Sequence, residues 1–288
     1  MNRRELILGA SSAFAALGVQ ASEYPAAGSN HTSLPNHEQW RKLDGEIRTW
    51  WDADLIHATE EAIRGDESRA LLFLPFPYLR VSASPGGTYY GQFSVDTAFT
   101  KYALFAHDRR DIVRDQLLNY LFMIERYGFV LNANMKGLVT RSQTPFFLPP
   151  TLWRYYSSTR DLDLLYRAYP LLKQEYQHYW NAPHHQTPTG LATNRDLGDP
   201  VLSPELASEA EVLDWTPVFG GDVRRCVPLA TNSGLVSFAR VLALIAKEVG
   251  RGEEAHAFTQ KADTRTALIH KYCWNEAAGL FLEYDYVA

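Results

Sequence analysis

Asp214 is the acidic residue whose neighbours most directly suggest chemistry. It lies in the stretch EAEVLDWTPVF (209–219), between a leucine and a tryptophan. Apolar, aromatic surroundings remove water from a carboxyl group, which disfavours its charged form and raises its pKa. A general acid needs that property near neutral pH, although an aspartate here could instead cap a helix or turn. We expect Glu209 and Glu211, in the same stretch, to be solvated helix charges.

A polar loop at residues 126–147 carries a second set of candidate groups. Amide, guanidinium and hydroxyl side chains stand there beside proline and phenylalanine, at Asn132, Asn134, Arg141, Ser142 and Gln143. Such a mixture suits a neutral polyhydroxylated ligand, because hydroxyl groups both donate and accept hydrogen bonds. Arg141 and Gln143 could equally well satisfy the carbonyl groups of the loop.

Asp96 is a third candidate. It follows a glycine turn, Pro85-Gly86-Gly87, and stands at the start of a predicted helix. Aspartate is a good N-cap residue, so a capping role is the alternative to ligand contact. A fourth segment, YCWNEAAGLFLEYDY (272–286), is expected to turn between a helix end and an extended aromatic stretch.

Helical periodicity supplies the elements that must position these groups. Apolar residues recur at steps of three and four in 109–127, 161–179 and 252–272, while 234–246 is apolar nearly all round. One-faced helices alternating with a covered helix predict an inner ring wrapped by an outer ring. The remaining stretches are predicted as long loops that carry function, at 81–96, 128–146, 181–218 and 274–288.

Composition excludes several classes of partner. The 288 residues carry a formal net charge of -5 without a basic cluster beyond the first residues, so we expect no nucleic-acid partner. Cys226 and Cys273 lack CxxC spacing, so we expect no metal site, and two buried free thiols are favoured over a disulfide.

Residues 1–21 have the features of an export signal. Arg3 and Arg4 precede a short apolar run, and Val19-Gln20-Ala21 fits a cleavage site. The arginine pair is similar to a twin-arginine signal, with an ordinary secretory signal or an amphipathic start as alternatives. The run is too short for stable membrane insertion, so the protein is expected to be periplasmic or secreted. Residues 22–36 are predicted as a linker and 37–288 as the folded domain.

Taken in order, the motifs resemble the trehalase family of glycoside hydrolases. The match rests on PGG at 85–87, Asp96, the YGFVLNANM…TRSQTPF loop, VLDWTP, VPLATNS and WNEAAGLFLEYDY, and covers about residues 80–288. The resemblance implies an all-α (α/α)6 toroid, no cofactor, and inverting hydrolysis of an α-glucosidic bond by an aspartate acid and a glutamate base. It assigns Asp214 as the general acid. Substrate-binding positions fall at Asp96, Asn132, Arg141, Gln143 and Glu205.

The chain departs from the family pattern at several positions. Thr88 and Val95 replace an arginine and a tryptophan, and Val212-Leu213 replaces Gly-Trp before the acid. The arginine would supply a forked hydrogen-bond donor and the tryptophan a flat ring against the sugar. Without them, a related α-glucoside or oligosaccharide is favoured over trehalose as the substrate. No residue matches the family's glutamate base, so we expect a partial toroid without efficient hydrolysis. The alternatives are another toroid α-glucosidase and a truncated, non-catalytic sugar-binding relative.

Overall fold

The computed structural model describes residues 36–81, 89–146, 148–212 and 216–288, which divide into two compact units. The first unit ends at Asp52 and also takes in Ala288, and the second runs from Ala53 to Val287. The predicted folded region 37–288 is therefore divided after Asp52. Helix α2 (His37–Ala53) makes up most of the described part of the first unit, and none of its residues is buried.

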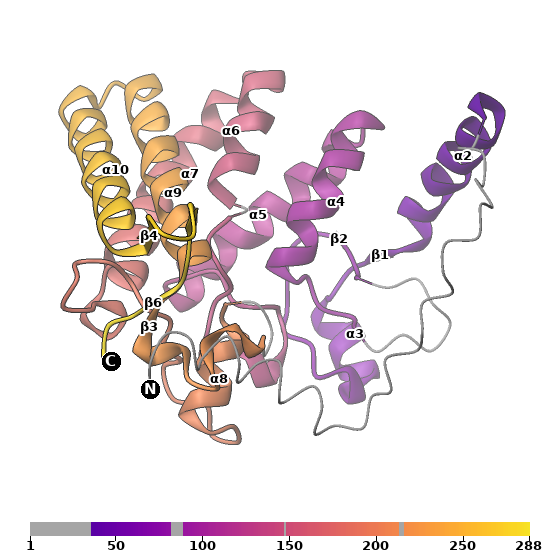
Figure 1. Ribbon diagram of the computed structural model, residues 1–288. Helices are drawn as coiled ribbons and strands as arrows, with labels where there is room; N and C mark the ends of the chain where they lie inside the picture. The colour runs from indigo at the N-terminus through magenta and orange to yellow at the C-terminus, as the bar shows by residue number, and fades with distance from the viewer. Residues whose placement is uncertain (1–35, 82–88, 147, 213–215) are drawn as a thin grey trace. The chain divides into compact units, whose positions relative to one another are not determined.

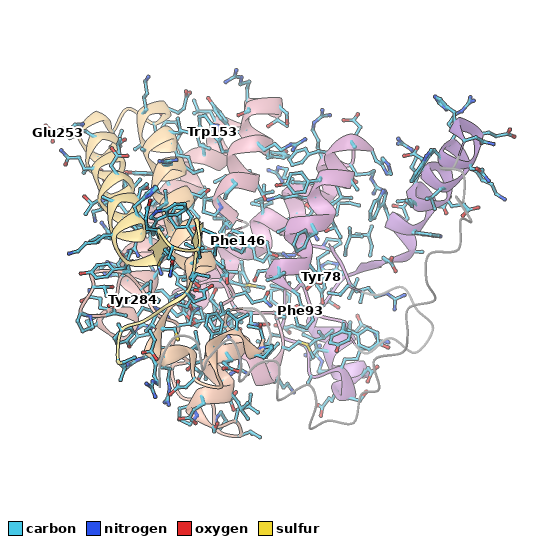
Figure 2. The ribbon with its side chains drawn as sticks, in the orientation of Figure 1. Tyr78, Phe93, Phe146, Trp153, Glu253 and Tyr284 are labelled. Atoms are coloured by element: carbon cyan, nitrogen blue, oxygen red, sulfur yellow. The ribbon has the colours of Figure 1, made fainter. Side chains whose placement is uncertain are left out.

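Helices build the second unit, and their side chains fill the spaces between the ribbons (Figures 1 and 2). The α-helices are α3 (Glu60–Gly65), α4 (Ser94–Ala106), α5 (Arg110–Tyr127), α6 (Leu148–Thr159), α7 (Leu162–Glu175), α8 (Pro204–Ala210), α9 (Leu229–Glu248) and α10 (Gly252–Cys273). A π-helical segment, η3 (Tyr176–Trp180), continues α7. Short 3-10 turns are η1 (Glu67–Arg69), η2 (Lys136–Leu138), η4 (Pro183–His185), η5 (Pro217–Phe219) and η6 (Val223–Arg225).

Two layers of helices pack against each other. Helices α4, α6 and α9 contact one another in sequence along one layer, while α5 and α7 are neighbours in the second. Helix α10 packs along α9. The predicted apolar faces point into this packing, with Val113, Leu117, Leu121 and Ile124 all buried on α5. The all-α class predicted from helical periodicity is thereby confirmed.

The few strands are short antiparallel pairs. Strand β1 (Leu55–Ile56) pairs with β2 (Tyr78–Leu79), β3 (Cys226–Val227) with β6 (Tyr284–Asp285), and β4 (Trp274–Asn275) with β5 (Leu280–Phe281). The pair β4–β5 makes the turn that we predicted within 272–286. Strands β3 and β6 lie near α8 at one end of the helices (Figure 1).

Helix α8 corrects the prediction that 181–218 is one long loop. Ser203 caps it by accepting a hydrogen bond from the backbone N–H of Leu206, and Pro204 occupies its first turn. Serine at the N-cap followed by proline and an acidic residue is a helix-start signal. Apolar periodicity does not reveal this helix, because it has only seven residues.

Helix α9 is long and apolar enough to cross a membrane, but 67% of its most apolar window is buried inside the protein. Packing against α6, α7 and α10 accounts for that composition. Cys226 and Cys273 are free and buried, as expected. Burial raises the pKa of Cys226 to about 12 and that of Cys273 to about 11.

Candidate functional site

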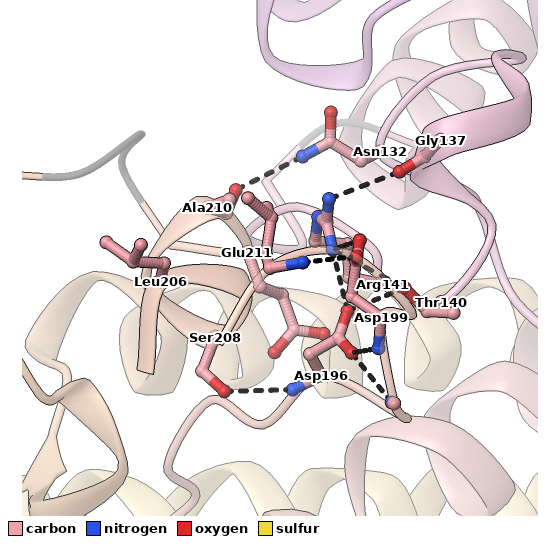
Figure 3. Close-up of polar contacts among 12 residues, drawn as sticks. Asn132, Gly137, Thr140, Arg141, Asp196, Asp199, Leu206, Ser208, Ala210 and Glu211 are labelled. Carbon is pink, nitrogen blue, oxygen red and sulfur yellow. Dashed lines mark hydrogen bonds and ion pairs between the residues drawn. The ribbon is translucent and has the colours of Figure 1, made fainter. Parts of the chain in front are cut away.

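Three segments distant in sequence meet at the helix ends: the start of α4, the loop 128–146 and the end of α8. The backbone N–H of Val95 donates to Oε1 of Gln143 at 2.9 Å. The Asn132 side chain donates to the carbonyl of Ala210 at 3.1 Å (Figure 3). Asn132 and Gln143 are both buried, so these bonds fix the loop against both helices.

Asp96 lies in the first turn of α4 and is half-buried. It is not the N-cap: that position is held by Phe93, whose side chain makes no capping bond. The capping alternative is therefore wrong. A carboxylate in the first turn is stabilised by the partial positive charge of the helix N-terminus. Asp96 stands next to Val95 and so beside the Gln143 contact.

Arg141 occupies a buried ion-pair cluster (Figure 3). Its Nη1 lies 2.8 Å from carboxylate oxygens of both Asp196 and Asp199, and its Nη2 donates to the carbonyl of Gly137 at 3.2 Å. The Arg141 side chain is only 2% exposed. Burial opposes ionisation of Asp199, but backbone N–H donors and Arg141 outweigh it and lower the pKa of that carboxyl. In this arrangement Arg141 organises the loop, and its contact with a sugar stays a prediction.

Glu211 is the most connected acidic group near the site. Its carboxylate accepts hydrogen bonds from the hydroxyl of Tyr179, the Asn194 amide at 3.1 Å and the backbone N–H of Arg195 at 3.1 Å. His185 Nε2 lies 3.3 Å from it, with both side chains fully buried. Four donors to one carboxylate, with the Ser142 N–H at 3.4 Å as the fourth, make it a junction between distant segments.

The prediction that Glu209 and Glu211 are solvated charges is wrong. Their exposures are 5% and 0%. The end of α8 that carries these two glutamates faces the interior, because the polar groups that contact the Glu211 carboxylate come from the loop 128–146, from η3 and η4, and from residues 194–195. Burial is also the main cause that raises the pKa of Glu209.

Glu175, at the end of α7, shares a small cavity with Ser142 and Gln143. Its Oε1 accepts a hydrogen bond from the backbone N–H of Val130 at 2.9 Å. Burial raises the pKa of Glu175 to about 7, against the opposing effect of that hydrogen bond. A carboxyl group that changes protonation near neutral pH beside the predicted sugar site is a functional candidate.

Glu205 is not brought to this cluster. It lies in the first turn of α8, five residues before Ala210, and its half-exposed carboxylate pairs with Arg224. Hydrogen bonds from its own backbone N–H and from the Ser203 side chain are the main causes that lower the pKa of Glu205, and Arg224 adds to them. Substrate contact by Glu205 stays a prediction.

Asp214, the predicted general acid, lies outside the described residues, as do Thr88 and the glycine turn at 85–87. The residues on either side of it are well anchored. The Thr144 hydroxyl donates to the carbonyl of Val212 at 2.8 Å, and Thr216 caps η5. The chain therefore enters the Asp214 segment from the same cluster that holds Gln143.

The described residues contain no group of three or more His, Cys, Asp or Glu side chains placed to hold a metal ion. The arrangement instead gathers amide and carboxyl groups with buried aromatic rings, which can orient a ligand rich in hydroxyl groups.

Sequence reasoning missed Glu175, Glu211, Asp196 and Asp199. Glu175 could have been found, because it falls three residues after Leu172 on the apolar face of α7, where a charge is unexpected. The role of Glu211 depends on partners from four distant segments, which no local pattern reveals.

The helical layers define an α/α protein with a cluster of buried polar side chains at its helix ends. A model of the trehalase family matches residues 20–209 and 216–288, and the chain belongs to that family. The matched stretches leave out 210–215, so the assignment of Asp214 rests on the motif resemblance alone.

Solved structures share the fold. Neutral trehalase Nth1 from Saccharomyces cerevisiae superposes with a TM-score of 0.65 at 22% identity, over 73% of this chain and 48% of that chain. A GH78 family rhamnosidase of Bacillus sp. GL1 gives 0.51 at 19% identity, over 68% of this chain and 19% of that one. The predicted trehalase-type helical toroid is confirmed as the fold class, and the chain spans about half the length of the yeast protein.

Proposed function

We propose that this chain provides the substrate-binding and acid-bearing part of an inverting glycoside hydrolase that acts on trehalose or a related α-glucoside. The observation that carries the proposal is the junction of α4, the loop 128–146 and α8 through Gln143–Val95 and Asn132–Ala210. Membership of the trehalase family supports it.

In the proposed reaction the Asp214 carboxyl group gives its proton to the glycosidic oxygen as the C–O bond breaks. A water oxygen bonds to the anomeric carbon from the opposite face, and a second carboxylate accepts the proton of that water. No residue of this chain is assigned to that second role. Asp96, Asn132 and Gln143 would orient the sugar.

The test follows glucose release and its anomeric form by NMR, with trehalose and a panel of α-glucosides. Inversion produces β-glucose from the first turnovers, whereas retention produces only α-glucose. Any turnover that the chain shows should be abolished by Asp214→Asn, while Asp263→Asn, an exposed change on α10, should leave it intact.

A binding arm separates recognition from chemistry. Calorimetry with trehalose should show saturable binding that Gln143→Ala weakens at least tenfold and the exposed control Gln260→Ala leaves unchanged. Absence of both turnover and saturable binding across the whole panel would contradict the proposal.

A second candidate for the substrate is an α-glucosidic oligosaccharide. Val95 favours it, because its half-buried side chain stands beside Asp96 where the family pattern has a flat tryptophan. A higher kcat/KM for a trisaccharide than for trehalose would select this candidate.

We further propose that the protein is exported through its N-terminal segment, which lies outside the described residues. Replacing both Arg3 and Arg4 by lysine should hold the protein in the cytoplasm if the twin-arginine route is used. Unchanged export in cell fractionation would contradict that route.

A further inference from the structure

A second cavity is lined in part by Trp180 and by His185, the residue that contacts Glu211. It measures about 260 Å³ and is lined by η3, η4, the following loop and Arg265 of α10. One buried water needs only roughly 10–15 Å³ on the same kind of measure. Gln186 and Gly190 line the cavity and are exposed, so it opens to solvent.

Arg265 is a buried cation whose partners are neutral. Its side chain donates to the amide oxygens of Asn232 at 2.6 Å and Asn181 at 2.7 Å, and it is 8% exposed. Across the described ranges of the chain it forms no ion pair with a carboxylate. Desolvation is the main cause that lowers the pKa of Arg265, whereas Tyr176 acts in the opposite direction.

The neighbouring groups add donors and positive charge. The indole N–H of Trp180, a residue that also lines the cavity, has no hydrogen-bond partner among the described residues. Lys261 stands one helical turn before Arg265, with its Nζ 5.9 Å from the centre of the Tyr176 ring. Glu211, the carboxylate that His185 of the cavity wall contacts, is already engaged by four other donors.

A buried charge without a counter-charge is costly, and an anion that enters the cavity would relieve that cost. A guanidinium presents its N–H groups in a planar fork that matches oxyanions better than a spherical ion. We propose that this cavity is a binding site for a small oxyanion, a phosphate or carboxylate group, held by Arg265. This site is separate from the sugar site and does not depend on the proposed hydrolase function.

The experiment titrates the full chain with inorganic phosphate, sodium acetate and sodium chloride at matched ionic strength, and follows Tm and the heat of binding. Phosphate or acetate should give a saturable heat of binding and should raise Tm with the logarithm of its concentration above Kd, by about 5 °C at a hundred times Kd, while chloride should do neither. Whichever of phosphate and acetate binds with the lower Kd identifies the kind of oxyanion that the site prefers.

Two kinds of variant test the site. Arg265→Gln should abolish the saturable response, and Arg265→Lys should weaken it, because the charge remains without the fork. Gln186→Glu places a negative charge at the exposed rim and leaves Arg265 in place, so it should weaken binding at least tenfold even if Arg265→Gln does not fold. Gln174→Glu, an exposed change on α7, is the matched control and should bind like the unaltered chain.

A heat of binding that does not saturate, a Tm rise that chloride reproduces, or binding that Gln186→Glu leaves unchanged would overturn the proposal and reduce the effect to general electrolyte stabilisation.

Discussion

Buried carboxyl groups set the pH response of this protein at the scale of single residues. Glu175 has a native pKa of about 7, against an ordinary value of 4.5. Because its pKa is raised in the folded state, folding becomes less favourable as pH rises from about 4.5 to about 7. Above that window the buried charge costs about 3 kcal/mol.

Glu175→Gln should remove that cost while keeping an acceptor for the Val130 N–H. We expect the variant to exceed the unaltered chain in free energy of unfolding by up to about 3 kcal/mol at pH 8 and to differ little at pH 5. Urea unfolding at the two pH values measures this, with exposed Glu253→Gln as the control. An equal difference at both pH values would contradict the raised pKa.

Glu211 should be needed for stability as well as for the site. Glu211→Ala leaves the donors of Tyr179, Asn194 and Arg195 without their acceptor in a buried place. We expect a loss of about 3–5 kcal/mol in urea unfolding. Glu253→Ala, which removes an exposed first-turn carboxylate (Figure 2), should cost at most about 1 kcal/mol. Similar losses of unfolding free energy in the two variants would argue against the role of Glu211 in joining these segments.

Residue identity was easier to predict than residue environment. The types and spacing of Asp96, Asn132 and Gln143 led to groups that the structure does bring to one cluster. The same reasoning placed Glu211 in solvent, because a glutamate next to a short helix is usually exposed. Its burial follows from contacts with Ser142, Tyr179 and Asn194, which are far from it in sequence.

At the scale of elements, α8 is held at its end by two side chains of one loop. Asn132 donates to Ala210, and the Thr144 hydroxyl donates to Val212. Because both bonds hold the same backbone, removing one should change the effect of removing the other.

A double-mutant cycle of Asn132→Ala and Thr144→Val should therefore give a coupling energy of at least about 0.5 kcal/mol in urea unfolding. Asn132→Ala combined with Asp161→Ala, which removes the N-cap of α7, serves as the uncoupled pair and should be additive within about 0.5 kcal/mol. Additivity in both cycles would show that the two bonds hold α8 independently.

Long helices were predictable and short ones were not. Helix α5 has 18 residues and α10 has 22, so their 3.6-residue pattern repeats often enough to recognise. Helix α8, with seven residues, completes about two turns, and its pattern includes a buried glutamate, Glu209. In the π-helical segment Tyr176–Trp180 the buried residues Tyr176, Tyr179 and Trp180 keep the spacing of three and four that an α-helical face has, so the apolar pattern does not reveal the change of helix type.

At the scale of the whole molecule, the two cysteines report on global unfolding. Both thiols are buried, and burial raises their pKa values to about 12 and about 11, so the reactive thiolate is scarce at pH 8. Iodoacetamide should add to neither cysteine in the native protein and to both in urea, as counted by mass spectrometry. Rapid labelling of either thiol without denaturant would contradict this packing.

His185 forms part of a wall between two regions of the protein. It lines the second cavity and contacts Glu211, which in turn accepts from the N–H of Ser142 beside Gln143. Any occupant of the cavity that shifts this imidazole alters the loop 128–146 through a single side chain. By thermodynamic reciprocity, the factor by which a ligand in this cavity changes the affinity of the loop for its own ligand equals the factor by which that second ligand changes the affinity of the cavity.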